Sequence, residues 1–198
     1  MTVPVLAVAA AFLLSLLLPF GLKPLLNRLG VLDVPNERSS HTTTTVRGVG
    51  ITVAVGLLAG LLLLLPAVPG QERPLLGVVA SVAAAAALLG WIEDYRGVSV
   101  RMRALLQCLI GAAGTALIVH LAEASWWWVP VGALAIAGYI NAANFMDGNN
   151  GISGLHGLAA GLLFAAAGVF EDQRWLLFAG LVVAASFAAF LPWNLGRG

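Results

Sequence analysis

Residues 3–22 have the sequence VPVLAVAAAFLLSLLLPFGL, which contains no charged side chain. A helix needs about 20 mostly apolar residues to cross the hydrocarbon core of a bilayer. Isolated strands cannot satisfy their backbone hydrogen bonds in lipid, so such stretches favour helices. The predicted spans are residues 3–22, 48–69, 75–92, 104–122, 126–143, 153–170 and 175–193. We therefore predict an all-α, polytopic membrane helix bundle of about seven transmembrane helices, forming one transmembrane domain over residues 1–198.

The composition of the whole chain supports this class. Of its 198 residues, 60% are hydrophobic and 10% are charged, and the mean hydropathy is +0.95. Soluble domains carry roughly 25% charged residues, so this chain has too few to cover a soluble surface. The net charge of +1 provides no basic field for nucleic acid. The chain is predicted to be an integral membrane protein without a nucleic-acid partner.

Lysine and arginine are unequally divided between two alternating sets of connections. One set holds only Arg73 and Arg174. Excess Lys and Arg in short connections marks the cytoplasmic side, which predicts that the N-terminus lies outside and the C-terminus inside. The basic set consists of Lys23, Arg28, Arg38, Arg47, Arg96, Arg101, Arg103 and Arg197.

The polar residues that could carry chemistry gather in three of the cytoplasmic connections. These are the stretches 33–50, 93–96 and 141–151. The centres of the predicted spans contain no Asp, Glu, Lys or Arg, whereas transporters place their sites near the bilayer midplane. This distribution favours chemistry at the inner membrane face.

Glu93 and Asp94 come where the third predicted span ends. Two carboxylates at a helix C-terminus are unfavourable without a cation, because the macrodipole is negative there. A salt bridge to Arg96, Arg101 or Arg103 would supply one. A divalent ion such as Mg²⁺, which prefers oxygen ligands and substrate phosphates, is the alternative.

The stretch 141–151 surrounds Asp147 with amides. Its asparagines supply donors and acceptors for a nucleobase, a sugar or a metal, although an ordinary Asn-Gly turn also contains such residues. They are Asn141, Asn144, Asn149 and Asn150.

The first connection holds Arg38, His41 and Arg47, which can bind phosphate oxygens. Alternatively, these side chains serve only the charge asymmetry that orients the chain.

Together, the three stretches resemble the polyprenyl-phosphate N-acetylhexosamine-1-phosphate transferases of glycosyltransferase family 4. The first stretch is most similar to the bacterial O-antigen branch, which implies a place in lipopolysaccharide and cell wall biogenesis. The residues that carry the match are Asp33-Val-Pro-Asn-Glu-Arg-Ser-Ser-His41 with Arg47-Gly48, Glu93-Asp94 followed by Arg96-Gly-Val-Ser99, and Asn141-Ala-Ala-Asn-Phe-Met-Asp-Gly148.

The resemblance implies an enzyme that transfers a HexNAc-1-phosphate from a UDP-sugar to undecaprenyl or another polyprenyl phosphate and releases UMP. It implies Mg²⁺ as cofactor, with Mn²⁺ as an alternative, in a multi-pass protein of the bacterial inner membrane. The resemblance is also compatible with a homo-oligomer. The implied residues are Glu93, Asp94 and Asp147 for catalysis, Asn144 and Asp147 for the metal, and Arg38, His41, Arg47, Asn141 and Asn150 for substrate.

Members of this family have further spans, so the chain is expected to be the N-terminal portion of a longer family fold. Two alternatives stay open at this point. One is a catalytically inactive fragment of the family. The other is a lipid-phosphate transporter, which would require polar residues through the interior of the bundle.

Overall fold

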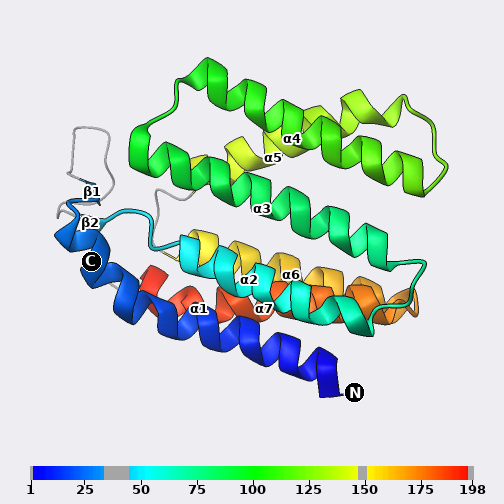
Figure 1. The fold of residues 1–198 in the computed structure, drawn as a ribbon, viewed down its shortest axis with the longest axis horizontal. Coiled ribbons are helices and arrows are strands. Elements are labelled where there is room, and N and C mark those ends of the chain that lie inside the picture. Colours follow the sequence, from blue (N-terminus) through cyan, green and yellow to red (C-terminus); the bar gives the residue numbers. More distant parts are fainter. Residues whose placement is uncertain (1, 34–44, 147–150, 196–198) are drawn as a thin grey trace. The chain divides into compact units, whose positions relative to one another are not determined.

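The computed structural model describes residues 2–33, 45–146 and 151–195, which are almost entirely helical (Figure 1). Only β1 and β2 are strands in these ranges, and they form one short antiparallel pair in which Leu32 is opposite Val46. The predicted all-α class is confirmed. The elements are α1 (Thr2–Arg28), β1 (Leu32–Asp33), β2 (Thr45–Val46), α2 (Ile51–Leu64), η1 (Leu65–Ala67), α3 (Arg73–Arg96), α4 (Val100–Leu121), α5 (Trp128–Met146), α6 (Ile152–Phe170) and α7 (Arg174–Leu195).

Six of the helices are long and apolar enough to cross a membrane, and they correspond to six of the predicted spans. The second predicted span, residues 48–69, is shorter than expected. Its α-helix ends at Leu64 and continues as the 3₁₀ turn η1, which contains Pro66. Proline lacks the backbone N–H that another α-helical turn needs. Together, α2 and η1 rise about 27 Å, slightly less than a hydrocarbon core of about 30 Å.

Several helices continue beyond the apolar stretches that predicted them. α1 extends to Arg28, α3 to Arg96 and α5 to Met146. Glu93 and Asp94 therefore lie at a helix C-terminus, as the sequence predicted, and residues 141–146, which the sequence assigned to a connection, lie in the final turns of α5. An apolar stretch ends at the membrane boundary, whereas a helix ends only where a residue stops it. For α3 that residue is Gly97, whose φ of +70° is left-handed.

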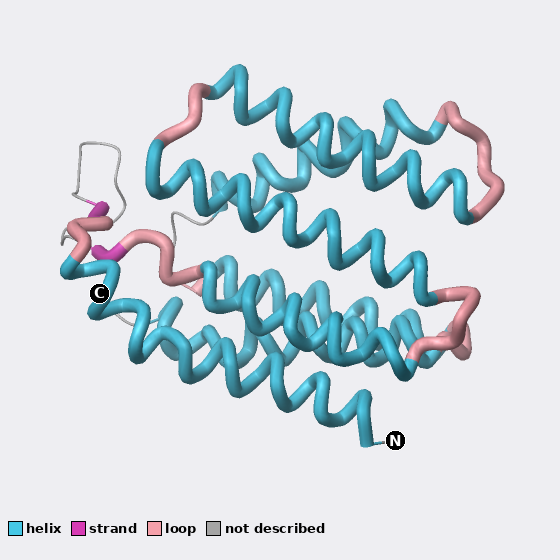
Figure 2. Tube along the Cα trace, viewed as in Figure 1, coloured by secondary structure: helices cyan, strands magenta, loops and turns pink. Residues whose placement is uncertain are grey.

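The helices divide into two compact units, residues 1–69 with 146–198 and residues 70–145, described here as unit 1 and unit 2. Short connections join α6 to α7 in unit 1 and the consecutive helices α3, α4 and α5 in unit 2 (Figure 2). The prediction of a single transmembrane domain stays a prediction.

In unit 1, α6 and α7 form an antiparallel hairpin with very close backbones. A Cβ on Gly161 would lie 2.4 Å from the backbone nitrogen of Ala184, and one on Gly168 would lie 2.2 Å from that of Leu177. Small residues at such positions let membrane helices approach closely.

Helix α1 packs on both α2 and α7 in the same unit. Gly56 of α2 leaves room for Ser15 of α1. At the other contact, Trp193 Nε1 donates to the Leu16 carbonyl oxygen over 3.1 Å, and its ring meets Phe20 edge-on. These contacts place the C-terminal ends of α1 and α7 at the same end of unit 1, together with the start of α2.

Unit 2 consists of α3, α4 and α5, with α4 antiparallel to each of the others. Gly114 of α4 faces Val82 of α3, and Gly132 of α5 faces Thr115 of α4. Consequently the end of α3, the start of α4 and the end of α5 lie at one end of this unit.

Candidate active site

A tight turn brings the acidic end of α3 against the basic start of α4. Gly97 adopts its left-handed conformation and donates its N–H to the Glu93 carbonyl oxygen over 2.9 Å. Ser99 then caps α4, since its Oγ accepts a hydrogen bond of 3.3 Å from the Met102 backbone nitrogen. With only residues 97–99 between the helices, side chains on the two facing turns come within reach of each other.

Within this hairpin, Glu93 forms an ion pair with Arg103 of α4. Their side chains are 26% and 22% exposed, so both are partly withdrawn from water. Of the three arginines that the sequence offered as partners, Arg103 forms this pair. Glu93 therefore has a structural partner, whatever further role it has.

Asp94, the neighbouring carboxylate, is exposed at the same end of unit 2. It belongs to the last turn of α3, as the sequence predicted. Adjacent residues on a helix are about 100° apart, so Asp94 and Glu93 do not share one face. Asp94 is therefore the carboxylate of this pair that is accessible from solution.

At the end of α5, Asn141 is joined to α4 by its side-chain amide. Its Nδ2 donates to Gln107 Oε1 and to the Ala137 carbonyl oxygen, the latter over 2.9 Å. Asn144 follows one turn later and is exposed. Residues three apart lie on the same face of a helix, so the two amides are neighbours.

One end of unit 1 contains residues of the first connection, the start of α6 and the end of α7. Arg47 is exposed, and its backbone N–H donates to the Val31 carbonyl oxygen over 3.0 Å. Gly151 begins α6 with a φ of +84°, and Asn194 Oδ1 accepts a hydrogen bond of 3.0 Å from the Gly154 backbone nitrogen. Asn194 thereby satisfies a donor of the first turn of α6 from a different helix.

Four predicted site residues lie outside the residues that the structure describes. They are Arg38 and His41 of the first connection and Asp147 and Asn150 of the connection before α6. Unit 2 contains four of the predicted residues, Glu93, Asp94, Asn141 and Asn144, together with the newly found Gln107. The remaining predicted residue that the structure describes, Arg47, belongs to unit 1.

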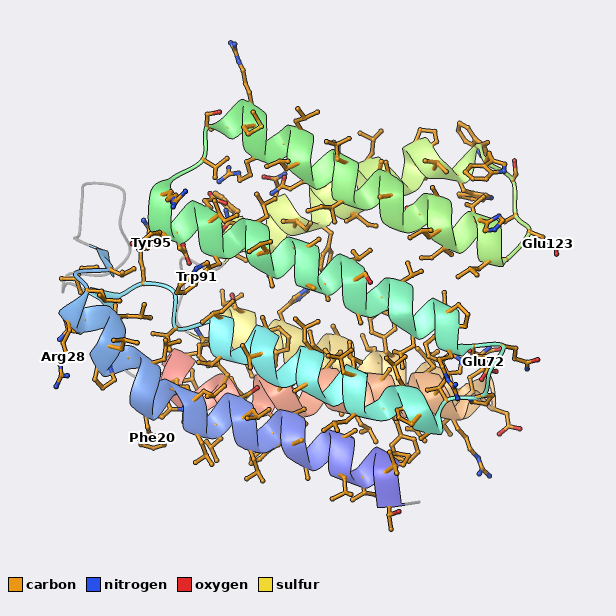
Figure 3. The ribbon with its side chains drawn as sticks, viewed as in Figure 1. Phe20, Arg28, Glu72, Trp91, Tyr95 and Glu123 are labelled. Carbon is orange, nitrogen blue, oxygen red and sulfur yellow. The ribbon has the colours of Figure 1, made fainter. Side chains whose placement is uncertain are left out.

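Unit 2 has different polar residues at its two ends (Figure 3). Trp91 and Tyr95 are at the end that carries Glu93 and Asp94, whereas Glu72 and Glu123 are at the other. The amides of Asn141 and Asn144 belong to the first end. The polar chemistry of this unit is thus concentrated at one end, which we call the polar end of unit 2.

The donors at the polar end of unit 2 fit a hard divalent cation. Asp94 offers carboxylate oxygens and Asn144 an amide oxygen, the ligand types that Mg²⁺ prefers. Both lie at helix C-termini, whose partial negative charge also attracts a cation. Within residues 2–33, 45–146 and 151–195, no three His, Cys, Asp or Glu residues cluster as metal ligands. A cation here would therefore depend on amide, water and phosphate oxygens as well.

Sequence reasoning missed Gln107 and Asn194. Gln107 is a lone amide in the apolar helix α4 and is 2% exposed. Charged side chains are the usual sign of a polar site inside a span, but an uncharged amide in lipid also requires a partner. Asn194 carried no distinguishing signal, because its partner is 40 residues away in sequence.

Comparison with known proteins identifies the family. Residues 75–198 match the family model for glycosyl transferase family 4, and the chain belongs to this family. It is 27% identical to the "Probable undecaprenyl-phosphate N-acetylglucosaminyl 1-phosphate transferase" of Bacillus subtilis, over 94% of the chain and 55% of that protein. No solved structure matches the chain significantly.

Two further relatives have related names. The chain is 28% identical to the "Undecaprenyl-phosphate alpha-N-acetylglucosaminyl 1-phosphate transferase" of Yersinia pestis, over 93% of the chain and 53% of that protein. It is also 28% identical to the "Decaprenyl-phosphate N-acetylglucosaminephosphotransferase" of Mycobacterium leprae, over 87% of the chain and 50% of that protein. The chain spans about half the length of the curated relatives it matches. The relatives and the apolar helices indicate a multi-pass membrane protein.

Proposed function

We propose that the chain carries the membrane-face part of a site that transfers a HexNAc-1-phosphate from a UDP-sugar to a polyprenyl phosphate. The observation that carries the proposal is the polar end of unit 2, where Asp94, Asn141 and Asn144 occupy the last turns of membrane helices. One substrate is dissolved in the bilayer and the other in water. A site for both must lie at the membrane surface, where the ends of membrane-spanning helices are expected.

In the proposed reaction, a phosphate oxygen of the lipid attacks the sugar-bound phosphorus of the UDP-sugar. A new phosphorus–oxygen bond forms to the lipid phosphate. The bond between that phosphorus and the bridging oxygen breaks, and UMP leaves with the electron pair. A phosphate monoester has a second pKa of about 6, so the attacking oxygen is largely ionised at cytoplasmic pH and needs no strong general base.

Phosphoryl transfer then depends mainly on positioning and on neutralisation of charge. Asp94 would orient the reacting phosphates through a cation, and Asn144 would contribute an amide oxygen to it. Asp147, which follows α5 in the sequence, is proposed as a further ligand. Mg²⁺, or Mn²⁺ in its place, would supply the positive charge that balances the diphosphate.

The other residues have supporting roles in this proposal. Arg38, His41 and Arg47 would hold phosphate oxygens, and Asn150 would contact the nucleotide. Glu93 would act with Arg103 by fixing the α3–α4 hairpin that carries Asp94. We place the reaction at the cytoplasmic face of the bacterial inner membrane, which is consistent with the arginine-rich connections.

The test is UMP release by the purified chain in nanodiscs with UDP-GlcNAc, undecaprenyl phosphate and Mg²⁺. We expect Asp94→Asn and Asp147→Asn each to lower the rate by at least about 100-fold, because each removes a charge that balances the transition state. Glu123→Gln is the matched control, since Glu123 is an exposed carboxylate at the opposite end of unit 2. Its rate should be unchanged.

A parallel reaction should contain the separately expressed C-terminal half of a full-length relative. Release that requires this half, and that is still lost in Asp94→Asn, supports the proposed site. No release in either reaction, or equal rates in Asp94→Asn and Glu123→Gln, contradicts the proposal. Lipid-phosphate flux across vesicles without UMP release would favour a transporter instead.

A further inference from the structure

Gln107 is a buried polar residue that the proposed reaction does not use. It lies in α4, two helical turns after the start of that helix, and is 2% exposed. An amide in such a position costs free energy unless its polar atoms have partners. The partner of its oxygen is Asn141 Nδ2, at the end of α5.

This contact determines which way the Asn141 amide points. Its Nδ2 is 2.9 Å from the carbonyl oxygen of Ala137, which can only accept a hydrogen bond. The atom facing that carbonyl must therefore be the amide nitrogen. The second hydrogen on the same nitrogen is accepted by Gln107 Oε1. An asparagine amide has two N–H donors and one acceptor oxygen, so both donors are used within unit 2.

We infer that Gln107 is a positioning residue, which orients Asn141 so that its amide offers only the oxygen Oδ1 to a ligand. An acceptor cannot form a hydrogen bond with a phosphate oxygen, which is also an acceptor. Asn141 would therefore bind a hydroxyl or N–H donor on the sugar or base of the nucleotide, and not its diphosphate. The identity of the ligand in this inference rests on the proposed function. The orientation of the Asn141 amide does not depend on that function.

The orientation can be tested without turnover, by measuring hydrogen exchange of asparagine side-chain amides by NMR in the chain labelled with ¹⁵N-asparagine. Asn141 and Asn144 are both exposed residues on one helix face. Both Asn141 protons should nevertheless exchange at least about tenfold more slowly than those of Asn144, because both are donated to Gln107 and Ala137. In Gln107→Leu one Asn141 proton should exchange as fast as those of Asn144. In Gln107→Glu, which keeps an acceptor, both should stay protected. Equal exchange of Asn141 and Asn144 in the native chain would overturn the inference.

The functional consequence is tested with the same variants in the UMP-release assay. Gln107→Leu should raise the KM for UDP-GlcNAc about tenfold and leave the KM for undecaprenyl phosphate unchanged, with Gln107→Glu close to native. Ser81→Ala is the control for loss of a polar group from a helix of unit 2, since Ser81 bonds only within its own helix in the described residues. Equal loss of affinity for both substrates, or an unchanged KM for UDP-GlcNAc, would contradict the positioning role. If the native chain shows no turnover either alone or with the supplied C-terminal half, the proposed function fails, and the NMR result still decides the orientation of Asn141.

Discussion

At the scale of single residues, Glu93 and Arg103 each lie at an unfavourable helix end. Glu93 is in the last turn of α3, where the macrodipole is negative, and Arg103 is in the first turn of α4, where it is positive. Their ion pair offsets both conflicts. A cation at the end of α3 and a carboxylate at the start of α4 would suit the dipoles better, which indicates that stability alone did not select this order of charges.

Exchanging the two charges tests this explanation. The double variant Glu93→Lys with Arg103→Glu keeps an ion pair and places each charge at its favourable pole, so we expect it to be at least as stable as the native chain. Arg103→Glu alone puts two carboxylates together and should lower the free energy of unfolding by about 1 kcal/mol. Reversible unfolding in mixed detergent and SDS measures the free energy of unfolding of both variants. A double variant less stable than Arg103→Glu would contradict the dipole argument.

Asn194 provides a second prediction at this scale. It accepts a hydrogen bond from the Gly154 backbone nitrogen, which no residue of α6 itself can satisfy. We expect Asn194→Leu to lower the free energy of unfolding by about 1 kcal/mol, which is typical of a lost N-cap. Asn27→Leu is the control, since Asn27 is exposed on α1. Similar effects of the two variants in the same unfolding assay would show that Asn194 does not act as a cap.

At the scale of helices, glycines have opposite roles depending on what faces them. Gly161 is against the backbone of α7, whereas a Cβ at Gly77 of α3 would meet nothing within 4 Å. Gly157 and Gly161 are four residues apart, the spacing that allows close helix contacts, but the same spacing arises by chance in a glycine- and alanine-rich chain. The structure shows which glycines are contact positions.

This difference predicts opposite effects of the same substitution. Gly161→Ala should lower the free energy of unfolding by about 1–3 kcal/mol, because two backbones must separate to make room. Gly77→Ala should raise it by up to about 1 kcal/mol, because alanine favours helices more than glycine does. The assay is again unfolding in mixed detergent and SDS. A stabilising Gly161→Ala would mean that α6 and α7 do not pack as described.

At the scale of the whole molecule, the orientation of the chain in the membrane stays a prediction with a direct test. In a Cys108→Ala background, single cysteines replace Asn27, Arg96, Glu123 and Glu171. We expect an impermeant maleimide to label Asn27→Cys and Arg96→Cys only from the cytoplasmic side, because basic connections are retained there. Glu123→Cys and Glu171→Cys should be labelled only from outside. The reverse pattern would place the proposed site on the wrong side for a cytoplasmic nucleotide.

Much of the fold could be predicted from sequence, because lipid leaves few choices. A long apolar stretch must satisfy its own backbone and is therefore a helix. The differences between the predicted and the observed helices concern where individual helices end. α3 ends at the left-handed Gly97 rather than where hydropathy falls, α5 continues past its apolar stretch to Met146, and α2 ends at Leu64, two residues before Pro66.

The candidate site was predictable in its residue types but not in its pairings. Glu93 had three possible arginine partners in sequence, and only the turn at Gly97 selects Arg103. Gln107 was missed because its contact with Asn141 joins residues 34 positions apart. Long-range contacts of this kind follow from the packing of α4 on α5, which composition does not determine.

The length of α1 has a consequence for the first connection. Its 27 residues rise about 40 Å, whereas the hydrocarbon core is about 30 Å thick. The apolar part ends at Leu22, so residues 23–28 extend about 9 Å into the aqueous phase. The Arg47 backbone N–H donates to the Val31 carbonyl oxygen, just beyond this extension, and we therefore expect the exposed arginine to lie in the hydrated headgroup region. Because an exposed charge is screened by salt, we expect rising ionic strength to weaken its attraction for a phosphate long before it disturbs the contacts between the helices.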